Sequence, residues 1–209
     1  SHKNYALFRI GDRHATYSKS DKLTVNLENL DITSVSNQDK GLIQAGYGAM
    51  QLDLNMKDVN LTWAPTSIHE RGAITVGCAE PEFPTTTMLN LTMTDCNLDV
   101  SEAKDAHAIY VEDNATGTIK LDGTNITTAA GQSVYNNNIP VYVTDKETSV
   151  FFEGSDFYEI RVEEADTTDF TAYKNTLKAN SFTEHSTKNI GNAQYAVYKN
   201  DEMALYVNQ

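Results

Sequence analysis

The chain is poor in cysteine and in basic residues. Its 209 residues include two cysteines, and 16 lysines and arginines stand against 29 aspartates and glutamates, which gives a formal net charge of −13. Two cysteines cannot build the disulfide framework of a small secreted domain. We therefore interpret Cys78 and Cys96 as buried thiols, although both are expected to point inward, which would also fit a disulfide between them. The acidic surplus repels nucleic-acid phosphates and anionic membrane surfaces. We therefore expect no nucleic-acid partner.

Membrane-spanning and metal-binding patterns are also missing. No apolar stretch approaches the length of a transmembrane helix, and no charged start followed by an apolar run indicates a secretory signal, so we expect no direct membrane insertion. The five histidines lack ligand spacing, and no calcium loop of the form Asp-x-Asp-x-Asp-Gly occurs. We expect no metal site and no cofactor. Calcium would suit the plentiful acidic loops, but no motif supports it.

One phrase of alternating apolar residues recurs along the chain. Leu23–Thr33, Leu52–Thr62 and Leu89–Asp99 share one side-chain register, and Gly117–Thr127 and Thr148–Tyr158 repeat it more loosely. Residues two apart in a strand point to one face, so each copy begins as a strand with one apolar face. Recurrence at a long period is typical of a stacked β architecture.

Each copy loses its alternation once, at the same place. Such a slip turns all later side chains to the other face unless the backbone bends there. In five copies the residue at the slip is of a type that tolerates a left-handed conformation. We therefore predict a tight corner at Asn29, Asp58, Asp95, Gly123 and Gly154, and a weaker sixth copy places Ala179 there.

A third apolar strand lies between successive copies, as at Ile43–Ala45, Ile74–Val76 and Ile109–Val111. Three short strands per repeat around one apolar interior predict an all-β fold, namely a right-handed parallel β-helix (solenoid) of about six coils with three strands per coil. Because the repeat extends from about Phe8 to Val207, we expect residues 1–209 to be a single β-helix domain. The last residues resemble the opening of another copy, which indicates a fragment of a longer exported protein.

The phrase His107–Thr127, with its inward aliphatic residues and its Asn, Asp and Gly corners, resembles the pectin-lyase-like superfamily of right-handed parallel β-helices. Within it, the chain most resembles non-enzymatic bacterial surface adhesins, both autotransporter passengers and the pectate-lyase-like adhesive domains of Gram-positive surface proteins. The resemblance implies an extracellular location on a bacterial cell surface and a carbohydrate- or matrix-binding role.

The resemblance also implies where an enzyme of this superfamily would carry its acids, on or beside one sheet. The residues expected to point outward from the third strands include no acid; they are Arg9, Gln44, Thr75, Tyr110, Tyr142, Arg161 and Tyr198. Glycoside hydrolysis needs paired carboxylates. We predict no catalytic residue and no enzymatic activity, so a polysaccharide lyase or hydrolase with acids supplied by loops is the least favoured alternative.

Two features indicate a ligand site. Tyr110 and Tyr142 occupy equivalent outward positions in successive repeats, about 4.8 Å apart, where they would form an aromatic ladder that either binds sugar rings or only stabilises the sheet. Two long loops, Trp63–Arg71 and Cys78–Thr87, would either bind a ligand or cover the core. The predicted site residues are Trp63, Arg71, Glu80, Glu82, Tyr110 and Tyr142.

These observations favour a bacterial cell-surface adhesin segment whose partner is a glycan or a host extracellular-matrix or surface protein. A structural stalk that only extends another domain is the alternative. The irregular loop lengths argue against the stalk, because a stalk has no need of them.

Overall fold

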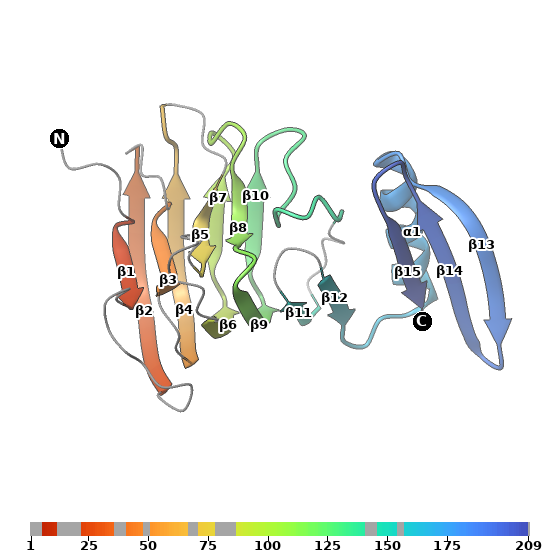
Figure 1. Cartoon of the computed structure of the whole chain (residues 1–209), viewed down its shortest axis with the longest axis horizontal. Coiled ribbons are helices and arrows are strands. Elements are labelled where there is room, and N and C mark those ends of the chain that lie inside the picture. Colours follow the sequence, from red (N-terminus) through yellow and green to blue (C-terminus); the bar gives the residue numbers. More distant parts are fainter. Residues whose placement is uncertain are drawn as a thin grey trace. The chain divides into compact units, whose positions relative to one another are not determined.

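The computed structural model describes residues 6–11, 22–35, 41–47, 51–66, 71–77, 87–140, 146–153 and 157–208. The chain divides into two compact units (Figure 1). Unit 1 comprises Ser1–Ile139 and Glu147–Arg161, and unit 2 comprises Pro140–Lys146 and Val162–Gln209. No helix among the described residues has the length and apolarity that a membrane span requires.

The first sheet of unit 1 is parallel throughout. Its strands in spatial order are β1 (Phe8–Gly11), β3 (Ile43–Tyr47), β5 (Gly72–Val76) and β8 (His107–Val111) (Figure 1). Ile43 pairs with Ile74, which pairs with Ile109, and all three are fully buried. The predicted register of these strands is confirmed.

The second sheet of unit 1 has eight strands and contains the repeated phrases. β4 pairs in parallel with β2 on one side; on the other side it pairs with β6 through its first half and with β7 through its second half. β9 continues from β6 and β10 from β7, also in parallel. The strands are β2 (Lys22–Ser34), β4 (Gln51–Trp63), β6 (Thr87–Thr94), β7 (Asn97–Val100), β9 (Ala115–Asp122), β10 (Asn125–Thr128), β11 (Thr148–Glu153) and β12 (Phe157–Val162).

The eight-stranded sheet turns at the predicted corner residues. Asn29, Asp58 and Asp95 have φ angles of 53°, 52° and 52°, and Gly123 has 57°. Only glycine, asparagine and aspartate adopt this left-handed conformation at low cost. Four predicted corners are therefore confirmed, and the fifth, Gly154, lies outside the described residues. Because each copy turns within one sheet, its apolar side chains stay on the buried side before and after the corner.

The predicted parallel β-helix of about six coils is wrong. β11 pairs antiparallel with β9, with Val150 opposite Ile119, so the fifth copy does not continue the parallel stack. The sixth copy is not a strand at all, because Leu177 and Ala179 lie in a helix. The prediction of three strands per coil is also wrong, because the two strand segments of each copy belong to one bent sheet. The fold is mostly β with mixed sheets, and its described part includes one helix.

Unit 2 packs that helix, α1 (Thr167–Ala179), against a three-stranded antiparallel sheet. The Asp166 carboxylate accepts hydrogen bonds from the Thr168 and Asp169 amides, and the Asp169 carboxylate accepts one from the Asp166 amide. This capping box satisfies donors that the first helical turn leaves unpaired. The sheet has the order β13 (Thr183–Ile190), β14 (Ala193–Lys199) and β15 (Ala204–Asn208).

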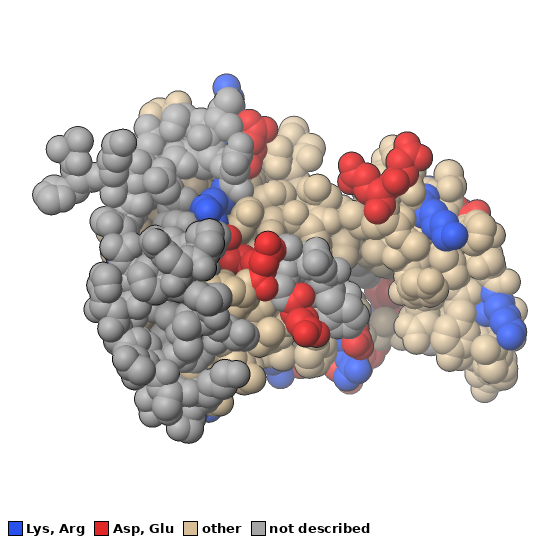
Figure 2. All heavy atoms as spheres, viewed as in Figure 1, with Lys and Arg blue, Asp and Glu red and all other residues tan. Residues whose placement is uncertain are grey.

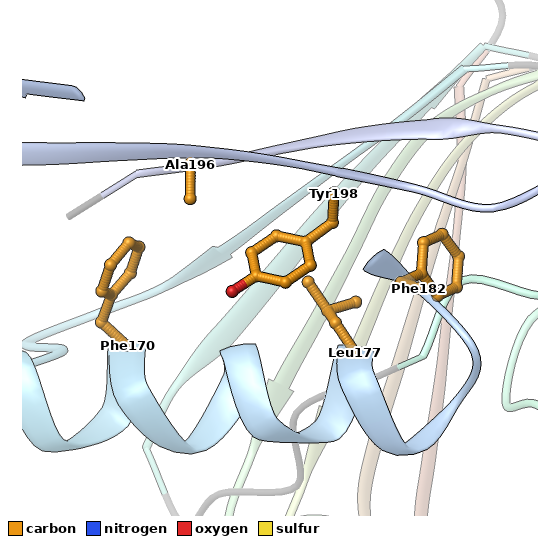
Figure 3. Close-up of a cluster of buried hydrophobic side chains, with 5 residues drawn as sticks. All are labelled: Phe170, Leu177, Phe182, Ala196 and Tyr198. Atoms are coloured by element: carbon orange, nitrogen blue, oxygen red, sulfur yellow. The ribbon is translucent and has the colours of Figure 1, made fainter. Parts of the chain in front are cut away.

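The core of unit 2 lies between α1 and β14. Phe170 and Leu177 extend from the helix toward Ala196 and Tyr198, and Phe182 closes one end (Figure 3). Tyr198 is fully buried and its hydroxyl donates to the Glu184 carboxylate at 2.9 Å. The sequence predicted an outward Tyr198, which is wrong because this strand belongs to a separate sheet with the opposite face buried.

Candidate functional site

The structure brings together two of the predicted site residues. Arg71 and Tyr110 lie on the first sheet of unit 1, with the guanidinium carbon of Arg71 5.2 Å from the centre of the Tyr110 ring. Trp63 is fully buried at the end of β4, so its indole packs in the core and offers no face to a ligand. Glu80, Glu82 and Tyr142 lie outside the described residues.

The Arg71 side chain is bound within the protein. Its Nη1 forms an ion pair with Oε1 of Glu112, whose side chain is only 5% exposed. The cation also covers one face of Tyr110, an arrangement that is stabilising in its own right. A buried carboxylate needs such a partner, because an unpaired buried charge is costly. This cluster therefore has a sufficient structural role without a ligand.

The outer face of the first sheet offers little free surface near this cluster. Gln44 and Thr75, which the sequence predicted to point outward into solvent, are 1% and 0% exposed. Ile109 forms a parallel β-bridge with Tyr135. The repeat register instead predicted residues 141–143 as the neighbouring strand. The next position along that segment, beside Tyr110, is Asn136. Tyr142, the other member of the predicted aromatic ladder, lies outside the described residues.

The solvent face of the eight-stranded sheet is a set of polar rows. The amide of Asn60 donates to Asp31 at 2.6 Å, that of Asn125 to Asn97 at 3.0 Å, and that of Asn55 to Asn26 at 2.9 Å. Such cross-strand pairs stabilise a sheet, and their polar groups are largely bonded to one another. We assign these rows to structure.

Helix α1 covers one face of the unit 2 sheet, and the other face is open. Since Ala196 and Tyr198 point toward the helix, the alternate residues of β14 point away from it (Figure 3). Cross-strand partners in an antiparallel sheet share a face. The residues on this side, here called the open face, are Thr183, Ser186, Lys188, Ile190, Ala193, Tyr195, Val197, Lys199, Ala204, Tyr206 and Asn208.

Two tyrosines dominate the open face. Tyr206 is 82% exposed and Tyr195 is 41% exposed. Tyr206 is the cross-strand partner of Val197 and therefore a diagonal neighbour of Tyr195, at a separation that aromatic side chains can span. Neither ring packs against another ring in the described part of the chain. Two aromatic surfaces on a rigid sheet can stack on flat apolar faces of a ligand.

The open face ends in a shallow depression of about 410 Å³, which is lined by Ser181, Thr183, Lys199, Asn200, Asp201 and Glu202. Thr183 and Lys199 belong to both the depression and the open face. Figure 2 shows acidic side chains gathered at the end of unit 2 where β14 joins β15, with mostly uncharged surface elsewhere on the visible face of that unit. The depression adds hydrogen-bonding groups to the aromatic surface.

Sequence reasoning missed Tyr195 and Tyr206. In the segment Ala193–Lys199, both the odd-numbered and the even-numbered positions include apolar or aromatic residues. This pattern indicates a strand with one buried face and an aromatic residue on the opposite face. The repeat register predicted that Tyr198 points outward, which is the reverse of its buried position in the structure. The described residues contain no cluster of three or more His, Cys, Asp or Glu side chains that could hold a metal ion.

The chain matches no protein-family model, and no curated protein and no solved structure is significantly similar to it.

Proposed function

We propose that the protein is an extracellular, non-enzymatic segment of a bacterial cell-surface adhesin and that the open face of unit 2 binds a glycan. The observation that carries this proposal is the pair of exposed tyrosines, Tyr195 and Tyr206, on one face of a sheet whose other face is anchored by α1. Sugar rings have an apolar face that stacks on aromatic rings, while their hydroxyls need polar partners. Thr183 and Asn200 in the adjoining depression supply such partners.

The sheet holds the backbones of the two tyrosines in fixed relative positions. Tyr195 lies on the central strand, which is hydrogen-bonded on both sides, and Gly191 at φ +61° occupies the tight turn that joins β13 to β14. Because this backbone is already ordered, the conformational entropy lost on binding is confined to the tyrosine side chains, which favours measurable affinity from a small contact area. A host matrix protein is the other partner class that the resemblance implies.

A structural stalk is the second candidate function. It is favoured by the self-bonded polar rows of unit 1, such as Asp31 with Asn60, because these rows need no ligand to satisfy them. The stalk predicts that the tyrosines of the open face can be removed without loss of function.

A glycan array probed with the whole chain tests the proposal. We expect glycans to bind the wild type and to bind the double variant Tyr195→Ala/Tyr206→Ala at least about tenfold more weakly, which is about 1.4 kcal/mol. The matched control is Tyr110→Ala, which removes a partly exposed tyrosine from unit 1 and should leave glycan binding unchanged.

Two results would contradict the proposal. Absence of binding to any glycan would favour the stalk. Normal binding by the double variant together with lost binding by Tyr110→Ala would return the site to the Arg71–Tyr110 cluster. Circular dichroism of each variant separates lost binding from lost folding.

A further inference from the structure

The open face has a charge that differs from the rest of the protein. The whole chain carries 29 acids against 16 bases, yet the open face holds Lys188 and Lys199 and no acid. Lys188 is the direct cross-strand partner of Tyr195, and Lys199 lies four residues along the same strand from Tyr195. At about 3.3 Å per residue, the two lysine positions are about 13 Å apart along the sheet, on either side of the tyrosine surface.

These two lysines are available to a ligand. Elsewhere in unit 2, Lys146 pairs with Asp169 and Lys178 with Glu184, and Lys174 donates to Gln194. Among the described residues, Lys188 and Lys199 form no ion pair. The net negative charge of the protein repels an anionic ligand. A lysine without a carboxylate partner gives such a ligand a local attraction.

We propose that the ligand of the open face is an anionic glycan, a sugar chain bearing carboxylate or sulfate groups whose rings stack on Tyr195 and Tyr206 and whose acidic groups lie against Lys188 and Lys199. This inference rests on the proposed function and narrows its ligand class. Asp201 and Glu202 line the depression beside Lys199 and oppose an anion there. The stronger anionic contact is therefore at Lys188, which lies beside Tyr195 and away from these acids.

Charge-matched polymers test the inference. The probes are polygalacturonate against its fully methyl-esterified neutral form, and dextran sulfate against dextran, so that each pair shares a backbone and differs in charge. We expect at least about tenfold tighter binding of the whole chain to one anionic member than to its neutral counterpart. The uronate and sulfate arms distinguish the two sources of negative charge.

Lysine variants assign the effect to the open face. Lys188→Gln/Lys199→Gln should weaken binding of the anionic polymer by about five- to tenfold at about 0.01 M ionic strength and by less at about 0.15 M, where screening is stronger. Lys104→Gln is the control, since it removes one positive charge from an exposed position in unit 1 and should change nothing. Lys188→Gln alone should cost more affinity than Lys199→Gln alone.

The other outcomes separate this inference from the proposed function. Equal binding of neutral and anionic polymers that still depends on Tyr195 and Tyr206 would overturn the anionic preference and keep the glycan site. Equal losses in Lys188→Gln and in Lys104→Gln, each of which removes one positive charge, would also overturn it, because the attraction would then be diffuse. Binding only to a deglycosylated matrix protein, or to no polymer, would overturn both.

Discussion

Gly117 shows how tightly the backbones of the eight-stranded sheet approach one another. It pairs with Leu89 at a φ of +148°, and a Cβ atom built on it would overlap the Leu89 carbonyl oxygen. Gly131 also has a positive φ, of +83°, but a Cβ built there would meet nothing within 4 Å. The two glycines therefore separate the cost of backbone strain from the cost of a backbone clash.

Gly117→Ala should destabilise the protein more than Gly131→Ala. We expect a cost of about 1 kcal/mol for Gly131→Ala from strain alone, and at least about 2–3 kcal/mol more for Gly117→Ala, because two hydrogen-bonded strands must move apart. Urea denaturation followed by circular dichroism measures both. Equal losses of stability would mean that the close pairing of Gly117 with Leu89 does not exist in solution.

His107 gives the stability of unit 1 a dependence on pH. Burial lowers the pKa of its imidazole below the usual 6.5, against a hydrogen bond to the Ser133 carbonyl oxygen, 3.1 Å from Nδ1, which acts the other way. The unfolded chain therefore binds a proton that the folded chain resists, so stability is fully present above about pH 6.5 and falls as the pH decreases through this value.

The variant His107→Asn should flatten this dependence. The Asn amide can still donate to Ser133, but it has no proton to gain. We expect the variant to lose less unfolding free energy than the wild type when the pH is lowered from about 7.5 to about 5, measured by urea denaturation at both values. Parallel losses in the two proteins would show that His107 does not contribute.

At the scale of elements, the edge of β8 is closed by a side chain. The Val111 amide donates to Oδ1 of Asn136 at 2.9 Å, and Nδ2 of Asn136 donates to the Val111 carbonyl oxygen at the same distance. One carboxamide thus replaces the backbone of a further strand. This matters because an open edge exposes unpaired groups that can pair with another chain.

Asn136→Leu should reopen this edge. Loss of both hydrogen bonds at a buried valine is expected to cost about 1–3 kcal/mol. Amide hydrogen exchange at Val111 should accelerate by the corresponding factor, whereas Asn138→Gly in the same loop, where the backbone has a φ of 58°, should leave that amide protected. An unchanged exchange rate at Val111 in the leucine variant would contradict the assignment.

Strand faces and corners follow from the sequence, but strand direction does not. Asn29, Asp58 and Asp95 could be predicted because few residue types tolerate their conformation. Val150 keeps the same alternation in a parallel or an antiparallel strand, so nothing in the pattern reveals the reversal at β11. Tyr110 and Tyr198 lie in similar alternating segments, and the pattern predicts an outward side chain for both. Tyr198 is buried because α1 packs against its side of the sheet, and the pattern does not reveal this tertiary contact. The open face was missed for the same reason.

At the scale of the molecule, the two units have separate cores with separate reporters. Trp63 is the single tryptophan of the chain and is fully buried in unit 1. The described helix, α1, belongs to unit 2, whose buried cluster of Phe170, Leu177, Phe182, Ala196 and Tyr198 lies entirely within that unit. A unit this small buries a limited apolar area and is expected to be only marginally stable.

Leu177→Ala should therefore unfold unit 2 and leave unit 1 folded. Truncating a fully buried leucine costs about 2–5 kcal/mol, a large fraction of the stability of a small domain. We expect the helical circular dichroism signal to be lost at a lower temperature while the fluorescence transition of Trp63 stays in place. The reciprocal variant Leu54→Ala, in the core of unit 1, should move the Trp63 transition and spare the helical signal. If either variant shifts both transitions equally, the two units unfold as one cooperative domain, and the open face would then depend on the integrity of the whole chain.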